Sequence, residues 1–396
     1  YLIESQYYQD VNTGERIEGA IKGMTSVLDP HSSFLNEEVF KKMTEETEGE
    51  FGGLGIEVTL KNGVITVISP IDDTPAFRAG LKAGDKIVEI DGESTVGVSL
   101  GQAVELMRGE AGTEIQIGVI GKGKKEVKRI SLKREVIEIK PVKSKLLDKR
   151  YLYVRLTQFQ KNSYDSIKEA MENLKSKANK NGGAEGMILD MRSNPGGLLD
   201  EAVDVSSIFL QDGVVVSTQG RNPKDKEIRY VKKTGYKDLD IPLIILINGA
   251  SASASEIVAG ALQDHGRAIV MGSQSFGKGS VQTIVRVDEL RAIKLTISEY
   301  MTPNERKIQA VGIKPDILIS DYEGQWVSEH KKESKYLREK DLKNHLRGSK
   351  ENNLKEEEKE VKQAVGKNPS NDYQVIQALK QLKSFDLIKK MLDKKN

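Results

Sequence analysis

The chain has 396 residues, which is enough for two or three domains with separate hydrophobic cores. Its 61 Lys and Arg residues nearly balance its 59 Asp and Glu residues, and the net charge of +2 argues against a dedicated nucleic-acid-binding protein. The absence of Cys excludes disulfides, zinc fingers, iron–sulfur clusters and thiol catalysis, while four His residues leave few candidates for a histidine mechanism.

Residues 1–50 are predicted to form a mostly helical N-terminal region. One apolar stripe recurs there at helical spacing, at Ile17, Ile21, Met24 and Leu28. Asp29-Pro30 is expected to end this helix, because a residue that precedes proline disfavours the helical conformation. A second, polar helix is predicted over residues 37–48.

Residues 51–136 are predicted to form a compact module of short strands. Strands at 56–60 and 64–68 flank Asn62-Gly63, and this dipeptide is a strong short-range signal for a β-hairpin. One further helix and two further strands are predicted over 100–108, 114–120 and 126–132.

Residues 137–322 show strands and helices in alternation, which predicts an α/β core. The strands are predicted at 151–156, 186–190, 214–218, 243–247, 268–271 and 294–300, and the helices at 163–178, 198–210 and 253–265. The densest apolar stretch, 241–247, is much shorter than the roughly 20 residues of a membrane-spanning helix, so it is interpreted as a buried strand.

Residues 323–396 are predicted to form a charged helical C-terminal region. The run 351–362 is dense in Glu and Lys, and a solvated face or flexible linker is the favoured interpretation. An apolar stripe follows at Val375, Ile376, Leu379, Leu382, Leu387 and Ile388. This stripe is expected either to dock on the core or to pair with a second subunit.

A serine-rich turn at 248–256 follows a predicted buried strand and begins a predicted helix. A serine at such a turn points its hydroxyl outward, and the backbone N–H groups at the start of the helix face an incoming anion. A serine nucleophile needs this geometry. The alternative is a helix N-cap with small packing residues around it.

The segment 276–282 places Lys278 between two glycines, where the backbone can pass close to another element. Burial lowers the pKa of a lysine toward neutrality, so that the amine can act as general base for a serine in a Ser–Lys dyad. Gln282 lies four residues further on and can hold the amine through its amide oxygen.

The histidines offer no equivalent base. His265 lies 12 residues beyond Ser253 on the same predicted helix, about 18 Å away, and Asp264 is excluded for the same reason. His31 belongs to a turn, where a satisfied structural histidine is the favoured interpretation. The other two histidines lie in the polar C-terminal region.

A second turn, at 189–197, also follows a buried strand and precedes a helix. Gly196 and Gly197 leave their backbone N–H groups unobstructed. One such N–H, together with the N–H of Ala254, can stabilise a tetrahedral oxyanion. A plain strand-to-helix turn is an equally good interpretation.

The segment 272–279 nearly matches a phosphate-binding loop. It lacks the final Ser or Thr that would hold Mg²⁺, because Gly279 occupies that position. Nucleotide binding is therefore disfavoured.

Three motifs together resemble the carboxyl-terminal processing peptidases, also called tail-specific proteases. The motifs are Ser-Ala-Ser-Ala-Ser-Glu at 251–256, Phe-Gly-Lys-Gly-Ser-Val-Gln at 276–282 and Arg-Ser-Asn-Pro-Gly-Gly at 192–197. Phe-Gly-Gly-Leu-Gly-Ile at 51–56, with the segment 75–92, resembles the PDZ domain of these enzymes. The segment 372–379 is similar, more weakly, to the family's C-terminal part.

The resemblance implies a serine endopeptidase with a crotonase/ClpP-like α/β protease core, an inserted PDZ domain and helical N- and C-terminal regions. In the family pattern the nucleophile lies 25 residues before the lysine, which selects Ser253 over Ser251 and Ser255. Lys278 matches the general base and Gln282 the residue that orients it. The oxyanion donors correspond to Gly196 or Gly197 and Ala254. The resemblance implies no metal and no cofactor.

The PDZ resemblance implies that protein or peptide substrates are captured by their free C-terminus. The N–H groups of Leu54, Gly55 and Ile56 can meet the terminal carboxylate, and the strand from Ile56 can add the peptide as a further strand. Arg108 is expected to sense the bound tail, to contact the core or to interact with the helix dipole. The alternative function is a non-catalytic PDZ scaffold that binds tails without cutting them.

The remaining expectations concern partners and location. The two apolar stripes favour a homodimer through the terminal helices, an adaptor protein is a further candidate partner, and nucleic acid is not expected. Because the chain starts at Tyr1 rather than Met, a mature or trimmed form is expected. The relatives work in the bacterial cell envelope, so the resemblance implies a periplasmic or other extracytoplasmic location.

Overall fold

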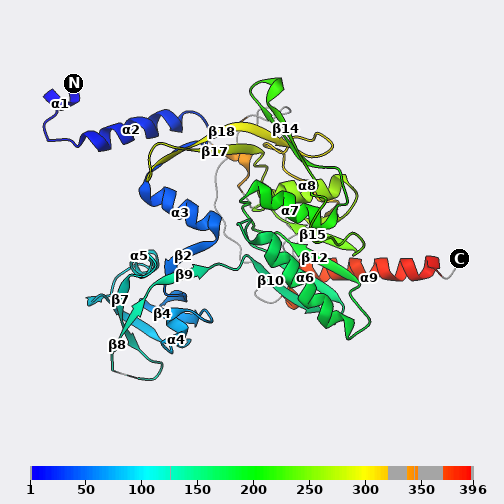
Figure 1. Ribbon diagram of the computed structural model, residues 1–396, viewed down its shortest axis with the longest axis horizontal. Helices are drawn as coiled ribbons and strands as arrows, with labels where there is room; N and C mark the ends of the chain where they lie inside the picture. The colour runs from blue at the N-terminus through cyan, green and yellow to red at the C-terminus, as the bar shows by residue number, and fades with distance from the viewer. Residues whose placement is uncertain (1, 125, 320–336, 343, 347–368, 394–396) are drawn as a thin grey trace, which may run out of the picture. The chain divides into compact units, whose positions relative to one another are not determined.

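The structure, a computed structural model, describes residues 2–124, 126–319, 337–342, 344–346 and 369–393, with side chains up to Phe385 in the last segment (Figure 1). The predicted charged run at 351–362 lies outside the described residues. The chain divides into two compact units, residues 48–140 and residues 1–47 with 141–396. Each unit has a hydrophobic core of its own.

The unit of residues 48–140 is built on an antiparallel sheet with the strand order β3-β4-β5-β7-β8. Its elements are β2 (Glu50–Gly53), β3 (Ile56–Lys61), β4 (Val64–Pro70), α4 (Pro75–Arg78), β5 (Lys86–Ile90), β6 (Glu93–Ser94), α5 (Leu100–Met107), β7 (Glu114–Ile120), β8 (Lys128–Lys133) and β9 (Glu135–Glu138). Asn62 and Gly63 join β3 to β4 with φ values of 52° and 75°, which confirms the predicted hairpin.

The other unit contains the predicted α/β core, with a sheet ordered β10-β11-β12-β15-β16-β19. Its strands are β10 (Val142–Leu147), β11 (Tyr151–Leu156), β12 (Gly186–Asp190), β15 (Leu243–Ile247), β16 (Ile269–Gly272) and β19 (Ile317–Leu318). All neighbours are parallel except β10, which runs antiparallel to β11 at the edge. Strands β12 and β15 are buried at every residue, as expected for parallel strands that are covered on both faces.

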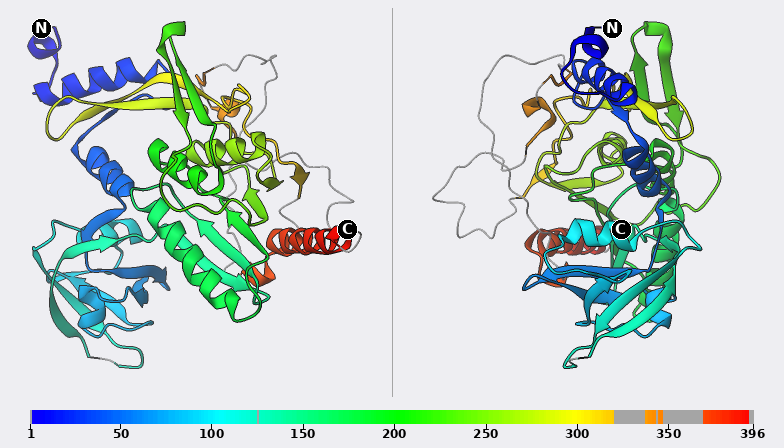
Figure 2. Two further views of the ribbon diagram at one scale, coloured as in Figure 1. Left: turned by 45° about the vertical axis from the view of Figure 1, so that its right-hand side comes forward. Right: turned by 90° about the vertical axis from the view of Figure 1, so that its left-hand side faces the viewer.

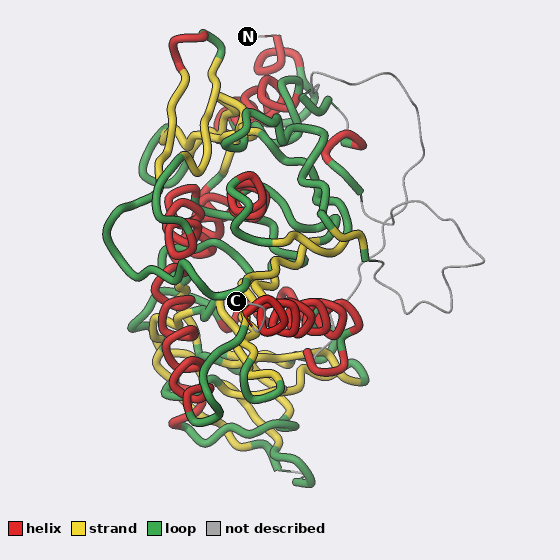
Figure 3. Tube along the Cα trace, turned by 90° about the vertical axis from the view of Figure 1, so that its right-hand side faces the viewer, coloured by secondary structure: helices red, strands yellow, loops and turns green. Residues whose placement is uncertain are grey.

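Helices cover the two faces of this sheet through alternate residues of each strand. Leu152 and Val154 of β11 pack in one core with α6 (Ser163–Asn179), α7 (Leu199–Phe209) and α8 (Ala254–Asp264). Tyr151 and Tyr153 face the opposite side, where they pack with α9 (Tyr373–Asp393). Figure 3 shows α9, which ends near the C label, beside the strands.

The position of α9 answers one question that the sequence left open. Val375, Ala378 and Leu382 are at most 1% exposed and belong to the core on that face of the sheet. The described part of the C-terminal apolar stripe therefore docks on the protein's own core. The side chains of Leu387 and Ile388 lie outside the described residues.

A second sheet in the same unit was not predicted as such. It is antiparallel, with the order β1-β18-β13-β14 and β17 also paired with β18. Its strands are β1 (Ser33–Leu35), β13 (Val214–Gly220), β14 (Lys226–Tyr230), β17 (Ser280–Arg286) and β18 (Ala292–Met301). The predicted strands at 214–218 and 294–300 thus belong to this sheet and not to the parallel one. Figure 2 shows the β13–β14 hairpin extending from it.

The N-terminal region contains α1 (Leu2–Gln6), α2 (Thr13–Ser26) and α3 (Glu37–Glu48) in addition to β1. The mostly helical prediction is therefore close, and α2 ends just before Asp29-Pro30 as expected. Ile17, Met24 and Leu28 are each at least half exposed, so this apolar stripe does not pack on the described core. Among the described helices, none combines the length and apolar character needed to cross a membrane.

Candidate active site

The predicted site residues lie on loops that leave one edge of the parallel sheet. The segments after β12, β15 and β16 contain Gly196–Gly197, Ser253 and Lys278, respectively. Because these three strands are parallel neighbours, their carboxyl ends lie side by side. The topology thus brings together three segments that are far apart in the sequence.

Ser253 is the residue that immediately precedes α8. Its φ of 54° lies in the left-handed region, which is uncommon for a residue with a side chain and marks a strained strand-to-helix turn. The residue is 8% exposed. A serine nucleophile on a sharp turn of this kind can present its hydroxyl at the edge of the sheet.

Glu256 joins the serine turn to the lysine loop, a role that the sequence analysis missed. Its Oε2 accepts the backbone N–H of Ser253 at 2.8 Å and that of Lys278 at 2.9 Å. Its Oε1 accepts the Ser275 hydroxyl at 2.6 Å and the Gly277 N–H at 2.8 Å. The backbone nitrogens of Ser253 and Lys278 are therefore held within two hydrogen-bond lengths of each other by one carboxylate oxygen.

The carboxylate of Glu256 is fully buried. Burial raises its pKa to about 7, while the hydrogen bonds from Ser275, Gly277, Ser253 and Lys278 act in the opposite direction. All four of these groups donate to the carboxylate, so they stabilise its ionised form.

The pKa of Lys278 lies below the ordinary lysine range, as a general base requires. Burial of the amine is the main cause, and the positive charge of Lys294 adds to it. Glu339, Glu256 and Asp29 act in the opposite direction. Among the described residues, none makes a hydrogen bond or ion pair with the Lys278 amine.

The glycines on both sides of Lys278 meet another segment closely, as predicted. A Cβ on Gly279 would lie 2.3 Å from the backbone nitrogen of Gln309, and a Cβ on Gly277 would lie 3.2 Å from that of Gly312. The Gly279 N–H also donates to Gln309 Oε1 at 2.9 Å. The lysine loop is thus fixed against the segment 309–312.

Gln282 lies on β17, four residues beyond Lys278, but its hydrogen bonds go to other residues. Its Nε2 donates to Ser280 Oγ at 2.9 Å and to Thr296 Oγ1 at 3.3 Å. Thr296 Oγ1 in turn donates to Asp29 Oδ1 at 3.1 Å. The structure shows no hydrogen bond between Gln282 and Lys278, both of which are described residues, so the predicted orienting contact is not formed.

The oxyanion candidates differ in whether their N–H groups are available. The N–H of Gly196 donates to Asn194 Oδ1 at 2.9 Å. The N–H groups of Gly197 and Ala254, by contrast, have no acceptor among the described residues. A Cβ on Gly196 would lie 2.7 Å from that of Ser253, so a glycine lets this loop approach the serine. The geometry favours Gly197 and Ala254 as the donor pair.

Among the described residues, His265, Asp264 and His31 form no hydrogen bond or ion pair with Ser253 or Lys278. His265 Nε2 contacts Val214 O at 2.8 Å, and Asp264 accepts the Asn304 N–H at 2.9 Å. His31 Nε2 lies 2.7 Å from Glu339 Oε2, so this turn histidine has a partner. Within the described ranges, no cluster of three His, Asp or Glu residues is arranged to hold a metal ion.

The near-match to a phosphate loop is also explained. The backbone N–H groups of residues 275–279 donate to acceptors of the protein itself, namely Ile313 O, Ser251 O, both oxygens of Glu256 and Gln309 Oε1. These amides are therefore not free to bind a phosphate.

In the unit of residues 48–140, β3 lies at the edge of its sheet, and β4 is its only neighbour among the described strands. The N–H groups of Leu54 and Gly55, just before β3, have no acceptor among the described residues. Arg108 follows the last residue of α5, and its guanidinium lies 4.4 Å from the ring centre of Phe51. A free strand edge beside unpaired N–H groups is the arrangement on which β-augmentation depends.

Comparison with known proteins identifies both units. Residues 150–319 match peptidase family S41, residues 52–132 match the PDZ domain, and residues 1–39 match the N-terminal domain of the activating protease CtpB. The chain is 43% identical over 386 residues to the carboxy-terminal-processing protease of Bartonella bacilliformis, covering 96% of this chain and 86% of the relative. The chain belongs to the carboxy-terminal processing protease family.

Two further similarities can be stated. The chain is 33% identical over 323 residues to the carboxy-terminal processing protease CtpA of Bacillus subtilis, covering 81% of this chain and 68% of the relative. A solved structure of a photosystem II D1 C-terminal processing protease is similar with 28% identity and a TM-score of 0.48, covering 79% and 84% of the two chains. The predicted family, the mixed α/β fold and the PDZ domain are confirmed.

Sequence reasoning about this protease missed two buried acidic residues near the lysine. Glu256 had a local signal, because a glutamate three residues after a serine at a helix start is a capping-box pattern. Glu339 had none. It is fully buried, accepts Gln309 Nε2 at 2.9 Å and donates its own N–H to Phe276 O at 3.2 Å, although it lies about 60 residues beyond the lysine loop.

Proposed function

We propose that this protease is a serine endopeptidase in which Ser253 is the nucleophile and Lys278 is the general base. The observation that supports the proposal most directly is the Glu256 carboxylate, which binds the backbone N–H groups of both residues. The lowered pKa of Lys278 and the strained backbone of Ser253 support it further.

In the proposed mechanism, the free amine of Lys278 takes the proton of the Ser253 hydroxyl as Ser253 Oγ attacks the scissile carbonyl. The N–H groups of Ala254 and Gly197 stabilise the resulting oxyanion. Lys278 then gives the proton to the leaving amine. A water molecule, activated by the same amine, hydrolyses the acyl-enzyme and releases the second product. Gln282 is assigned to orient Lys278.

The proposed substrate is a polypeptide with a free C-terminus, captured by the PDZ domain. The free edge of β3 and the unpaired N–H groups of Leu54 and Gly55 support this proposal. The terminal carboxylate would accept these N–H groups, and the last residues of the peptide would pair with β3 next to α5. Arg108, stacked on Phe51, is assigned to the same groove.

The test of the chemistry is cleavage of a denatured protein by the purified chain, followed by mass spectrometry. We expect Ser253→Ala and Lys278→Ala to lower kcat by about 10³-fold or more, since each removes a member of the reacting pair. Ser273→Ala and Lys307→Ala are the matched controls and should retain activity. Retained activity in Ser253→Ala or Lys278→Ala would refute the assignment, and binding without any cleavage by the wild type would favour the PDZ scaffold.

The test of substrate capture compares one peptide with a free C-terminal carboxylate and with a C-terminal amide. We expect a higher KM for the amide and little change in kcat, because the PDZ domain does not take part in bond cleavage. Equal KM values for acid and amide would contradict carboxylate capture.

We also propose that a second copy of this chain covers the exposed apolar residues of the N-terminal helices. Leu2, Met24 and Val27 are each more than 70% exposed, and covering them with a second copy would remove apolar surface from water. Light scattering on the wild type and on Met24→Glu tests this: we expect a dimer that the variant weakens. A monomeric wild type would rule the dimer out.

A further inference from the structure

Arg192 lies at the centre of a buried polar network outside the catalytic groups. Its side chain is 5% exposed. Nε and Nη2 donate to the two oxygens of Asp190 at 2.9 and 2.7 Å. Nη1 and Nη2 donate to the two oxygens of Asp372 at 3.0 and 3.1 Å, and Nη1 donates to Gln374 Oε1 at 2.7 Å. All five N–H groups of the guanidinium therefore have an acceptor.

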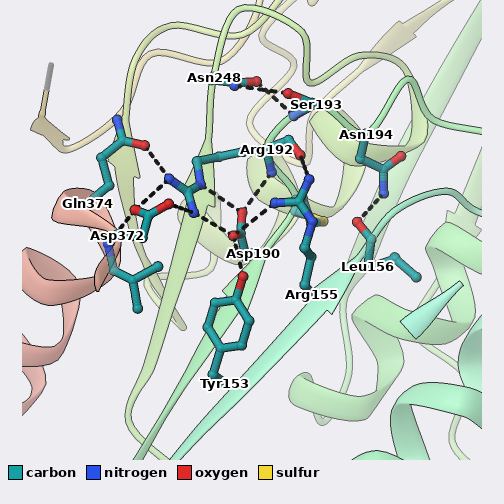
Figure 4. Close-up of polar contacts among 12 residues, drawn as sticks. Tyr153, Arg155, Leu156, Asp190, Arg192, Ser193, Asn194, Asn248, Asp372 and Gln374 are labelled. Carbon is teal, nitrogen blue, oxygen red and sulfur yellow. Dashed lines mark hydrogen bonds and ion pairs between the residues drawn. The ribbon is translucent and has the colours of Figure 1, made fainter. Parts of the chain in front are cut away.

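The acceptors come from two parts of the chain that are distant in sequence (Figure 4). Asp190 is the last residue of β12 and is fully buried. Asp372 immediately precedes α9, where its Oδ1 also accepts the Val375 N–H at 3.2 Å, and Gln374 lies in the first turn of α9. Arg192 thus connects the end of a core strand to the beginning of the C-terminal helix.

The other side of Arg192 leads directly to the proposed oxyanion loop. Its carbonyl oxygen accepts Arg155 Nη2 at 3.0 Å, and the next residue, Ser193, donates its N–H to Asn248 Oδ1 at 2.8 Å. Asn194 then accepts the Gly196 N–H, and its carbonyl oxygen accepts the N–H of Ala252 at 3.0 Å. The backbone from Arg192 to Gly196 is therefore held by successive hydrogen bonds, one of which reaches the serine turn at Ala252.

The charges in the network explain why its members depend on one another. Two carboxylates, Asp190 and Asp372, face two guanidinium groups, those of Arg192 and Arg155, so the buried charges balance. Removing one member leaves an uncompensated charge in the interior, which costs far more than loss of a surface ion pair. Arg192 will then move toward other partners, and the backbone that follows it moves too.

We propose that Asp372 and Gln374 are positioning residues for catalysis: by binding Arg192, the start of α9 holds the loop 192–197 so that the Gly197 N–H points into the oxyanion site. This gives a role to the segment 372–379, which the motifs of the protease core and the PDZ domain leave without one. The inference rests on the proposed serine mechanism, because it concerns the donor pair of that mechanism.

The experiment measures kcat and KM of the full-length chain on a short peptide ester and on its thionoester counterpart. Sulfur accepts hydrogen bonds more weakly than oxygen, so the preference for the ester reports how well the oxyanion donors are placed. The variants are Asp372→Asn, Gln374→Met and the double variant. Lys383→Met is the matched control, since Lys383 also ties α9 to the sheet side through an ion pair, with Asp148, but does not contact Arg192.

In the double variant we expect kcat on the ester to fall about 10- to 100-fold, KM to stay within about twofold, and the preference for the ester to fall in parallel. Gln374→Met keeps both carboxylates and should show the same pattern to a smaller extent. The single variants decide the question if the double variant does not fold.

Two results would overturn the inference. One is a lower melting temperature with unchanged kcat and unchanged ester preference, which would make the network purely structural. The other is a fall in kcat with the ester preference intact, or the same fall in Lys383→Met. The Ser253→Ala variant distinguishes failure of the serine mechanism from failure of the positioning role. If Ser253→Ala remains active, the serine mechanism is wrong. If Ser253→Ala is inactive while the Asp372 and Gln374 variants are unaffected, only the positioning role is refuted.

Discussion

Glu256 and Lys278 lie beside the same serine turn, yet their charged groups have opposite surroundings. The Glu256 carboxylate accepts four hydrogen bonds, two on each oxygen, and is fully buried. The Lys278 amine, in the part of the chain that the structure describes, has neither a hydrogen bond nor an ion pair. The main chain of Lys278 is held firmly, while the reactive end of its side chain is left without a partner.

This difference fits the proposed roles of Glu256 as a structural group and of Lys278 as the general base. A carboxylate that accepts four hydrogen bonds from the surrounding loops holds those loops in place. Burial of the Lys278 amine disfavours its ammonium form more than the nearby carboxyl groups of Glu339, Glu256 and Asp29 favour it, which suits the proposed role as a base. Beside the serine turn, Glu256 thus holds the backbone in place, and the Lys278 amine is left as the proposed proton acceptor.

Replacing Glu256 should have the largest effect among the tests of this comparison. In Glu256→Gln, an amide nitrogen replaces one carboxylate oxygen and cannot accept hydrogen bonds. The two donors that this oxygen binds therefore lose their acceptor, and the backbone there is no longer held. We expect kcat to fall about 100-fold or more, because a displacement of about 1 Å between Ser253 and Lys278 is enough. Melting temperature should fall as well, because buried donors lose their acceptor.

Glu185→Gln is the matched control for this substitution. Glu185 is also largely buried and paired, with Arg150, but it lies next to the opposite end of β12. It should change stability without changing kcat. If Glu256→Gln kept wild-type kcat, the carboxylate would not be what holds the two residues in register.

The sequence predicts the proposed reactive groups of this site better than the residues that hold them in place. Ser253, Lys278 and the glycines at 196–197 lie in local patterns, since turns with Gly and small residues have their own conformational signature. The parallel strands before them are equally visible as apolar runs. The position of these loops and the parallel strands that precede them could therefore be predicted together.

The supports depend on contacts that no local pattern encodes. Glu339 reaches the lysine loop from beyond the last core strand, and Asp372 reaches Arg192 across 180 residues of chain. Likewise, β1 from the N-terminal region joins the second sheet by pairing with β18, a strand more than 250 residues away. Such pairings follow from three-dimensional packing and leave no periodic signal in the sequence.

A smaller effect is expected from replacing Lys294, which tests whether a neighbouring positive charge helps to keep the Lys278 amine neutral. The positive charge of Lys294 helps to lower the pKa of Lys278. The free amine is the reactive form, so the rate should rise with pH through the pKa of Lys278. Lys294→Met removes a like charge, which raises that pKa, and the pH–rate profile should therefore shift to higher pH.

The measurement is kcat/KM from about pH 6 to 10 for the wild type and the variant. Lys307→Met is the control, because Lys307 forms an exposed ion pair with Glu299 and is not among the groups that shift Lys278. Its profile should coincide with that of the wild type. A flat wild-type profile would argue against a lysine base. An unchanged midpoint in Lys294→Met would mean that the charge of Lys294 does not affect the pKa of Lys278.

The smallest effect is expected at Gln282, and it decides how that residue acts. Its Nε2 bonds to Ser280 and Thr296, while its amide oxygen has no partner among the described residues. If this oxygen orients Lys278 during catalysis, Gln282→Ala should lower kcat by about tenfold, the equivalent of one neutral hydrogen bond, with KM unchanged. Thr296→Val should then have an effect of less than about threefold, because it leaves the oxygen in place. Equal losses in both variants would instead assign Gln282 to the chain of hydrogen bonds that runs through Thr296 to Asp29.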